Sequence, residues 1–157
     1  MAIKLSALLS YNRMPDYFIA VTNDENWSVV RDKHVWGLPE GRENLIKRLK
    51  KGDYLFIYLM SSRKGNELLP PRLAGLFQAA SDPYRDSKRI FKGRLYPNRV
   101  RLKPILIPKK PVEFKPLVPK LNFIKNKQFW AAHLRSGLAK IPEHDFKLLR
   151  EALERGR

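Results

Sequence analysis

The sequence predicts a single α+β domain built around a mostly β core. Its 157 residues, 43% of them hydrophobic, are enough for one compact domain with a buried core. Patterns typical of short helices come early, strand patterns lie in the middle, and helical patterns return at the end, without the regular alternation that produces parallel α/β sheets. We expect the domain to span residues 17–157, after an N-terminal extension or extra strand at 1–16.

The first strand and the first helix meet at a short polar segment. Tyr17–Val21 is an apolar run typical of a strand, and it stops at Thr22, Asn23 and Asp24. Each of these three residues can cap a helix, because its side-chain oxygen can accept a hydrogen bond from a free backbone amide. We therefore expect a helix that begins here and ends near Lys33.

The middle of the chain supplies the predicted core of the sheet. After a short helix at Glu43–Lys51, the segment Asp53–Met60 is apolar at nearly every position, which is typical of a central strand buried on both faces. Glycine, asparagine and two prolines predict a loop at 61–71. Arg72–Ala80 is the next expected strand, and Gly75 within it indicates a bulge or a close backbone approach.

The segment 83–128 differs in composition from the rest of the chain. It holds 14 lysines and arginines against two acidic residues, which gives it a net charge of +12 out of the total of +17. Asn98–Ile107 alternates enough to be a strand. Five prolines are expected to confine the neighbouring segments to sheet edges or irregular chain: Pro104, Pro108, Pro111, Pro116 and Pro119.

The C-terminal part of the chain predicts two helices. Asn126–Ser136 carries Trp130 and Leu134 one helical turn apart. Pro142 suits the first position of a final helix, because proline lacks the amide hydrogen that would be unpaired there. The inward face of that helix is expected to hold Phe146, Leu149 and Leu153.

The net charge of +17 points to a polyanion as the binding partner. A membrane surface would also attract this charge, but the sequence shows no strongly amphipathic basic helix, no lipidation signal and no apolar run long enough to span a membrane. It contains no cysteine, which excludes disulfides and leaves the redox compartment unreadable. The N-terminal residues form no clear signal peptide, so a cytoplasmic location is the default expectation.

The sequence predicts neither a metal nor a cofactor. His34, His133 and His144 lack the close spacing of metal ligands, and no cysteine is present to complete such a site. Glycine-rich patterns that cradle phosphates are absent, as is the Gly-x-Ser-x-Gly pattern of hydrolase nucleophiles.

A first candidate site lies within Tyr17–Pro39. Polar amides at the end of a strand and a tryptophan just after a short helix can converge on one hollow suited to a flat, hydrogen-bonding ligand such as a nucleobase. The structural alternative is that Asn23 and Asn26 are helix caps or solvated helix residues and that Trp36 belongs to the core.

The sequence YFIAVTNDENW…HVWGLP resembles the opening of an EVE domain, a member of the PUA-like superfamily. This resemblance extends from Tyr17 to about Leu153. It implies a small, partly open β-barrel with helices packed outside.

The same stretch is similar to the opening of YTH domains, which read N6-methyladenosine. In that family a Ser-Asn pair and a second Asn read the base edge, and a Trp in a Gly-Val-Trp-Ser step forms one wall of an aromatic cage. The corresponding residues here are Thr22, Asn23, Asn26 and Trp36. Two positions depart from the YTH pattern: Asn26 follows Asn23 by three residues instead of four, and Gly37 stands where the pattern has a serine. In YTH domains a loop after a later strand supplies a further cage aromatic, and the resemblance leaves Tyr84 and Phe91 as alternatives for it.

A second candidate site is the loop 82–99. It interleaves Tyr84, Phe91 and Tyr96 with arginines and lysines. Basic side chains neutralise phosphates, and aromatic faces stack on bases. The structural alternative is a solvated basic loop anchored to the core by its aromatic residues.

These observations predict a non-enzymatic module that binds RNA or DNA, either single-stranded or with a flipped base. The expected pocket for one modified base consists of Thr22, Asn23, Asn26, Trp36, Gly37 and one of Tyr84 and Phe91. The expected phosphate-binding residues are Arg85, Lys88, Arg89, Lys92, Arg94 and Arg99. Two alternatives remain: a small hydrolase acting on modified nucleosides, and a structural component of a ribonucleoprotein.

Overall fold

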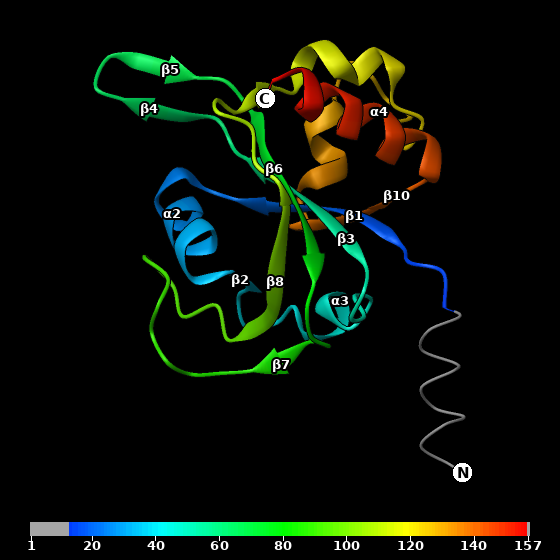
Figure 1. Cartoon of the computed structure of the whole chain (residues 1–157). Helices are drawn as coiled ribbons and strands as arrows, with labels where there is room; N and C mark the ends of the chain where they lie inside the picture. The colour runs from blue at the N-terminus through cyan, green and yellow to red at the C-terminus, as the bar shows by residue number, and fades with distance from the viewer. Residues whose placement is uncertain (1–12, 157) are drawn as a thin grey trace.

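The computed structural model describes residues 13–156 (Figure 1). The predicted extension at 1–16 lies mostly outside the described residues, and residues 13–16 lead into the first strand without regular structure. The strands are β1 (Tyr17–Thr22), β2 (Val35–Leu38), β3 (Tyr54–Leu59), β4 (Ser62–Lys64), β5 (Glu67–Leu69), β6 (Arg72–Ala79), β7 (Tyr84–Arg85), β8 (Asn98–Leu106), β9 (Val112–Glu113) and β10 (Leu138–Ile141). The helices are α2 (Asp24–Lys33), α3 (Glu43–Ile46), α4 (Glu143–Arg155) and the 3-10 helices η1 (Lys115–Lys120) and η2 (Trp130–Leu134).

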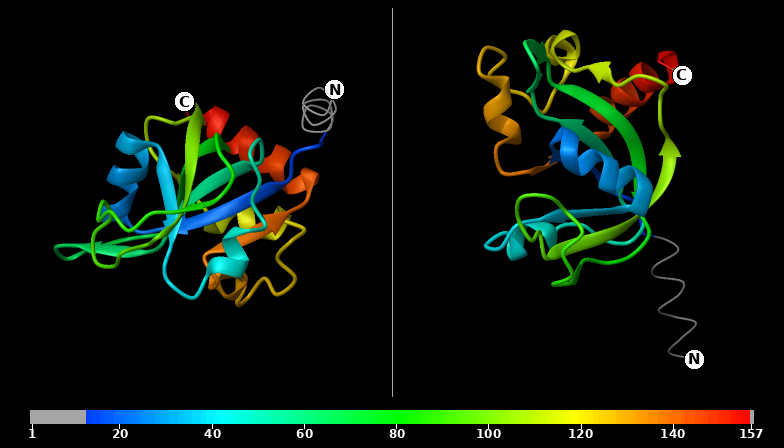
Figure 2. Two further views of the ribbon diagram at one scale, coloured as in Figure 1. Left: turned by 90° about the horizontal axis from the view of Figure 1, so that it is seen from below. Right: turned by 90° about the vertical axis from the view of Figure 1, so that its left-hand side faces the viewer.

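The main sheet is mixed and strongly curled. Its strands lie in the order β10-β1-β3-β6-β8-β2, with β7 added beside β8 and β9 beside β6. β1 and β3 pair in parallel, and the other pairs are antiparallel. The views in Figure 2 show the sheet curling into a half-barrel with helices outside it. The α+β class is therefore confirmed, as is the partly open barrel that the resemblance implied.

β3 is the central strand, as its apolar sequence predicted. Leu55, Ile57 and Leu59 point into one core, which also holds Val30 of α2. The alternate residues Phe56 and Tyr58 point into a second core on the other face of the sheet. The buried face of α4 covers this second core with three residues, Phe146, Leu149 and Leu153, as predicted.

The segment 61–71 is a hairpin rather than the predicted loop. β4 and β5 pair antiparallel, with Gly65 and Asn66 forming the turn between them. The hairpin projects beyond the body of the domain (Figure 1). Asp24 holds its base, because this carboxylate pairs with the Arg72 guanidinium and accepts a hydrogen bond from the Ser62 hydroxyl. Such short, mostly exposed strands carry no apolar alternation, so the sequence pattern did not reveal them.

Two predicted helices are shorter than expected. The helix at Glu43–Lys51 extends only over Glu43–Ile46. The helix at Asn126–Ser136 is the 3-10 helix η2, which covers only Trp130–Leu134. The final helix starts one residue later than expected, because Pro142 is its N-cap rather than its first helical residue.

Gly75 lies at a distortion of β6, as predicted. The pairing of β6 with β3 shifts register between Ile57 and Tyr58. A Cβ at Gly75 would lie 3.3 Å from the Leu106 carbonyl oxygen, so glycine permits the close approach of β8. Among the described residues, no helix is long and apolar enough to cross a membrane.

Candidate functional site

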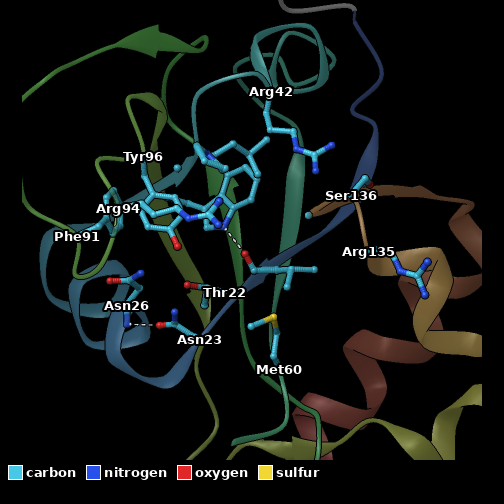
Figure 3. Close-up of a pocket in the computed structure, with 16 residues that line it drawn as sticks. Thr22, Asn23, Asn26, Arg42, Met60, Phe91, Arg94, Tyr96, Arg135 and Ser136 are labelled. Atoms are coloured by element: carbon cyan, nitrogen blue, oxygen red, sulfur yellow. Dashed lines mark hydrogen bonds between the residues drawn. The ribbon is translucent and has the colours of Figure 1, made fainter.

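A cavity of about 230 Å³ lies where the end of β1, the start of α2, strand β2 and the 86–97 loop meet (Figure 3). Phe91, Arg94 and Tyr96 approach it from one side, and Arg135 and Ser136 lie on the opposite side. Its lining consists of Val21, Thr22, Asn23, Asn26, Trp36, Gly37, Leu38, Pro39, Arg42, Met60, Phe91, Arg94, Tyr96, Arg135, Ser136 and Gly137.

Asn23 caps α2 and lines the cavity at the same time. Its Oδ1 accepts a hydrogen bond from the backbone amide of Asn26 at 2.8 Å, so Asn23 is the cap among the three candidates. Its Nδ2 has no hydrogen-bond partner in the described part of the chain, which leaves this donor for a ligand. Thr22, the last residue of β1, lies beside it in the cavity lining.

Asn26 joins α2 to the 86–97 loop. It is only 2% exposed, and its Oδ1 accepts a hydrogen bond from the Lys92 amide at 2.8 Å. Its Nδ2 donates to the Lys92 carbonyl oxygen at 3.3 Å. The side chain thus contributes to the cavity lining mainly by holding the loop against the helix.

Trp36 forms a buried wall of the cavity. Only 1% of the residue is exposed, and it packs in the first core. Its Nε1 donates a hydrogen bond to the Val21 carbonyl oxygen at 3.1 Å, which ties β2 to the end of β1. Trp36 therefore lies where both sequence-based interpretations placed it, because it is a core residue and also lines the cavity.

Gly37 allows the 86–97 loop to approach β2 closely. A Cβ at this position would lie 3.1 Å from the Tyr96 carbonyl oxygen, 3.2 Å from the Asn98 carbonyl oxygen and 3.2 Å from the Phe91 ring. The serine of the YTH pattern would push against this loop. The departure at Gly37 therefore has a packing reason.

Arg99 is not a phosphate-binding residue, which corrects the prediction. It is 1% exposed, and its guanidinium donates to the carbonyl oxygens of Lys88, Leu95 and Tyr96. It also lies 3.5 Å from the Asp86 carboxylate and 5.4 Å from the centre of the Phe91 ring. Its planar group of donors thus holds the 86–97 loop in shape.

Of the two loop aromatics that were candidates for the pocket, Phe91 lines the cavity and Tyr84 does not. Tyr84 belongs to β7 at the sheet edge, where the Arg101 guanidinium lies 5.3 Å from its ring centre. Tyr84 is therefore not part of the pocket.

Tyr96 is a cavity residue that the sequence analysis did not assign to the pocket. It packs against Phe91 edge-on, with ring centres 5.5 Å apart, and it is half-buried. Its φ of 49° is unusual for a residue other than glycine, and such strained positions often occur at binding sites. The only sequence signal was its place among the aromatic residues of the loop.

The predicted phosphate-binding residues other than Arg99 lie on the surface. Lys88, Arg89 and Lys92 are exposed on the 86–97 loop, and Arg94 also lines the cavity. Arg85 pairs with Glu40 at 2.6 Å and approaches Glu43 at 3.7 Å, so acidic partners partly neutralise its charge.

Two further arginines, Arg42 and Arg135, reach the cavity from distant parts of the sequence. Neither forms a salt bridge with a carboxylate in the described part of the chain. Both are isolated in the sequence, so no local pattern indicated their role.

The cavity has the chemistry of a binding site for a planar ligand with an anionic group nearby. As far as the structure describes the chain, its lining includes three arginines and no carboxylate, together with amide, hydroxyl and aromatic groups. Within residues 13–156, no group of three or more histidine, aspartate or glutamate side chains is arranged to hold a metal ion.

Comparison with known proteins places the chain in a family. The EVE domain model matches residues 16–152. The chain is 46% identical over 142 residues to a UPF0310 protein of Pyrococcus abyssi, and the alignment covers 87% of this chain and 99% of the relative. It is 41% identical over 144 residues to a UPF0310 protein of Pyrococcus horikoshii, which covers 87% and 98%.

Solved structures share the fold at low sequence identity. A hypothetical protein from Leishmania major has a TM-score of 0.65 at 14% identity and covers 92% of this chain and 98% of its own. Human THYN1 protein, in complex with DNA containing 5-methylcytosine, has a TM-score of 0.57 at 14% identity, covering 87% and 97%. The Mmi1 YTH domain, in complex with RNA, has a TM-score of 0.60 at 12% identity, covering 90% and 79%. From the match over residues 16–152 and the close relatives, we conclude that the chain belongs to the EVE domain family.

Proposed function

We propose that this protein is a nucleic-acid-binding module that holds one unstacked, modified base in the cavity beside Trp36. The observation that carries this proposal is the lining of the cavity. It combines the free amide nitrogen of Asn23, the aromatic residues Phe91 and Tyr96, and surrounding arginines, with no carboxylate from the described part of the chain. Hydrogen-bonding groups and aromatic faces suit a base, whereas the arginines suit its phosphates.

The size of the cavity agrees with a ligand of this kind. At about 230 Å³ it lies below the ~300–1,000 Å³ typical of sites for drug-sized molecules, so it suits a single ring system. Two proteins with the same fold support the ligand class, because human THYN1 is bound to DNA containing 5-methylcytosine and the Mmi1 YTH domain is bound to RNA.

A substitution at Asn23 tests the base pocket directly. Asn23→Ser keeps a side-chain oxygen that can cap α2, but it removes the Nδ2 donor. We expect this variant to melt like the parent and to lose about tenfold in preference for a strand with one modified base, which corresponds to about one hydrogen bond to the ligand. Fluorescence anisotropy with matched strands carrying cytosine or 5-methylcytosine, and adenine or N6-methyladenine, measures this preference.

The matched control for this experiment is Ser28→Ala, on the same helix. The Ser28 hydroxyl donates to the Glu25 carbonyl oxygen, and the residue does not line the cavity. This variant should keep the preference of the parent. The base pocket would lie elsewhere if Asn23→Ser discriminated between the strands as well as the parent does.

Salt should weaken binding strongly, because the exposed basic residues of the 86–97 loop are expected to neutralise phosphates. Replacing Lys88, Arg89 and Arg94 together by alanine should weaken binding of all strands alike. The slope of log affinity against log salt should become less steep by about 2, since each contact with a single strand contributes about 0.7.

A triple variant on α4 is the control for the salt experiment. It replaces three exposed residues, Lys147, Arg150 and Arg155, by alanine. This removes the same charge as the first triple variant, but from a helix that does not line the cavity. We expect its slope to stay close to that of the parent. A parent slope near zero would exclude phosphate contacts, and equal slopes for the two triple variants would place those contacts outside the 86–97 loop.

We also propose that the protein does not turn over its ligand. The polar side chains that line the cavity are amides, hydroxyls and guanidinium groups, beside aromatic and apolar residues. An acid–base pair of the kind that hydrolases use would need a carboxylate or histidine beside Thr22. Incubation with acylated and alkylated nucleosides followed by mass spectrometry should return each substrate unchanged. Product that forms with the parent but not with Thr22→Ala would identify a hydrolase instead.

A further inference from the structure

A second hollow of about 370 Å³ adjoins the proposed base cavity. The two share Val21, Met60 and Arg135 in their linings, so these three residues form the ridge between them. On its far side the second hollow is lined by residues that include Tyr58 and Trp130. The two hollows are therefore neighbours on the surface, on either side of this ridge.

The lining of the second hollow is mainly apolar and aromatic. Trp130 is half-buried, and its ring centre lies 5.3 Å from that of Phe114, which supports it from behind. Tyr58 meets Trp130 edge-on, with ring centres 6.5 Å apart. Among residues 13–156, no carboxylate lines this hollow, and its only charged lining residue is Arg135. An aromatic surface without negative charge suits the face of a nucleobase.

Tyr58 adds a polar group to this apolar surface. The side chain is largely buried, but its hydroxyl oxygen is not enclosed: it has no hydrogen-bond partner in the described part of the chain, where no enclosed side-chain oxygen lacks one. Burial raises the pKa of Tyr58 to about 12, so the phenol stays protonated and can donate to an acceptor on a base edge. Hydroxyl and aromatic groups therefore occur together here, as they do in the first cavity.

Arg135 stands at the ridge with its charge available. The residue is exposed, lines both hollows, and forms no salt bridge with a carboxylate in the described part of the chain. It follows η2, the 3-10 helix that carries Trp130. Neighbouring nucleotides of a strand share one phosphate, so bases held in adjoining hollows would place that phosphate at the ridge between them.

We infer that the second hollow is a subsite for the base next to the modified one, with Trp130 contacting that base and Arg135 the phosphate between the two. This inference rests on the proposed function, because it takes the first cavity as the site of the modified base. The partner is then a single strand of at least two ordered nucleotides. A third hollow, which shares Trp130 and includes Lys115, would let the strand continue past this subsite.

Four fluorescein-labelled DNA strands test the subsite. One is fully abasic, and one carries a single 5-methylcytosine among abasic nucleotides. The other two also carry an adenine directly beside the 5-methylcytosine, on one side or on the other. The number of phosphates is the same in every strand, so electrostatic contributions cancel in the comparison. We expect the added base to tighten binding about tenfold on one of the two sides, the size expected for a base stacked on an aromatic residue.

Trp130→Leu should reduce the gain from the second base to less than about twofold while leaving binding of the one-base strand unchanged, because leucine keeps apolar packing against Phe114. Ala131→Glu is a second test variant. Ala131 lines the hollow at an exposed position, so its replacement leaves the packing of the core unchanged. It should have the same effect on the gain. The control is Phe129→Ala, a neighbouring aromatic residue that is 63% exposed and does not line the hollow, and it should keep the full gain.

The outcomes separate the two proposals. If the one-base strand binds no better than a fully abasic strand, the base pocket itself is refuted, and the subsite with it. If the one-base strand binds but the second base adds nothing on either side, only the subsite is refuted. The same holds if the gain persists in Ala131→Glu, whose fold should be confirmed by circular dichroism and a melting curve.

Discussion

Trp36→Ala is expected to lower the free energy of unfolding by about 3–5 kcal/mol, a cost typical of removing a large buried aromatic residue. Trp36 is 1% exposed and packs in the first core, so its removal would leave a void between β2 and the centre of the sheet. It would also leave the Val21 carbonyl oxygen without its 3.1 Å hydrogen bond. Urea denaturation followed by circular dichroism measures the loss.

Trp36→Phe separates these two contributions. Phenylalanine keeps most of the apolar volume but cannot donate to the Val21 carbonyl oxygen, so we expect a loss of about 1–2 kcal/mol. A Trp36→Ala variant that unfolds at the same urea concentration as the parent would show that the indole is not a core residue. Because the expected loss is large, weaker binding by Trp36→Ala would not demonstrate stacking, and Asn23→Ser is the sharper test of base recognition.

Arg99→Ala is expected to cost about 3 kcal/mol of stability and to disorder the 86–97 loop. The substitution leaves the carbonyl oxygens of Lys88, Leu95 and Tyr96 without their shared donor, and each buried unpaired group carries a penalty of about 1–3 kcal/mol, partly relieved as the loop opens to water. Arg99→Lys should recover only part of the loss, because an ammonium group lacks the planar fork of donors that reaches all three.

Arg101→Ala is the matched control for this prediction. It removes the same charge from the same strand, but Arg101 is exposed and contacts the ring of Tyr84. We expect it to change stability by less than about 1 kcal/mol. Thermal melting of the variants distinguishes the two roles of Arg99. If Arg99 bound phosphate, the Arg99→Ala variant would melt at the same temperature as the parent, and its nucleic-acid binding would depend less on salt.

Several elements were predictable because their signals are local. The apolar run at Asp53–Met60 is β3, since a strand buried on both faces needs apolar residues at every position. The polar end of the first strand starts α2, although the pattern left three candidate caps and only the structure identifies Asn23. The hairpin within 61–71 was missed, because its strands are held by pairing and by Asp24 rather than by an apolar face.

Local sequence patterns predicted the α+β class, the resemblance to EVE domains and the segment that contains Asn23 and Trp36. They did not predict which of several chemically similar loop residues meet the cavity, because this depends on long-range contacts. Arg94 and Phe91 line it, whereas Arg99 turns inward to backbone carbonyl groups and Tyr84 lies at the sheet edge. A loop side chain takes its direction from contacts with residues distant in sequence, such as the hydrogen bonds between Asn26 and Lys92. Arg42 and Arg135 reach the cavity for the same reason, because the curled sheet brings together segments that share no local pattern.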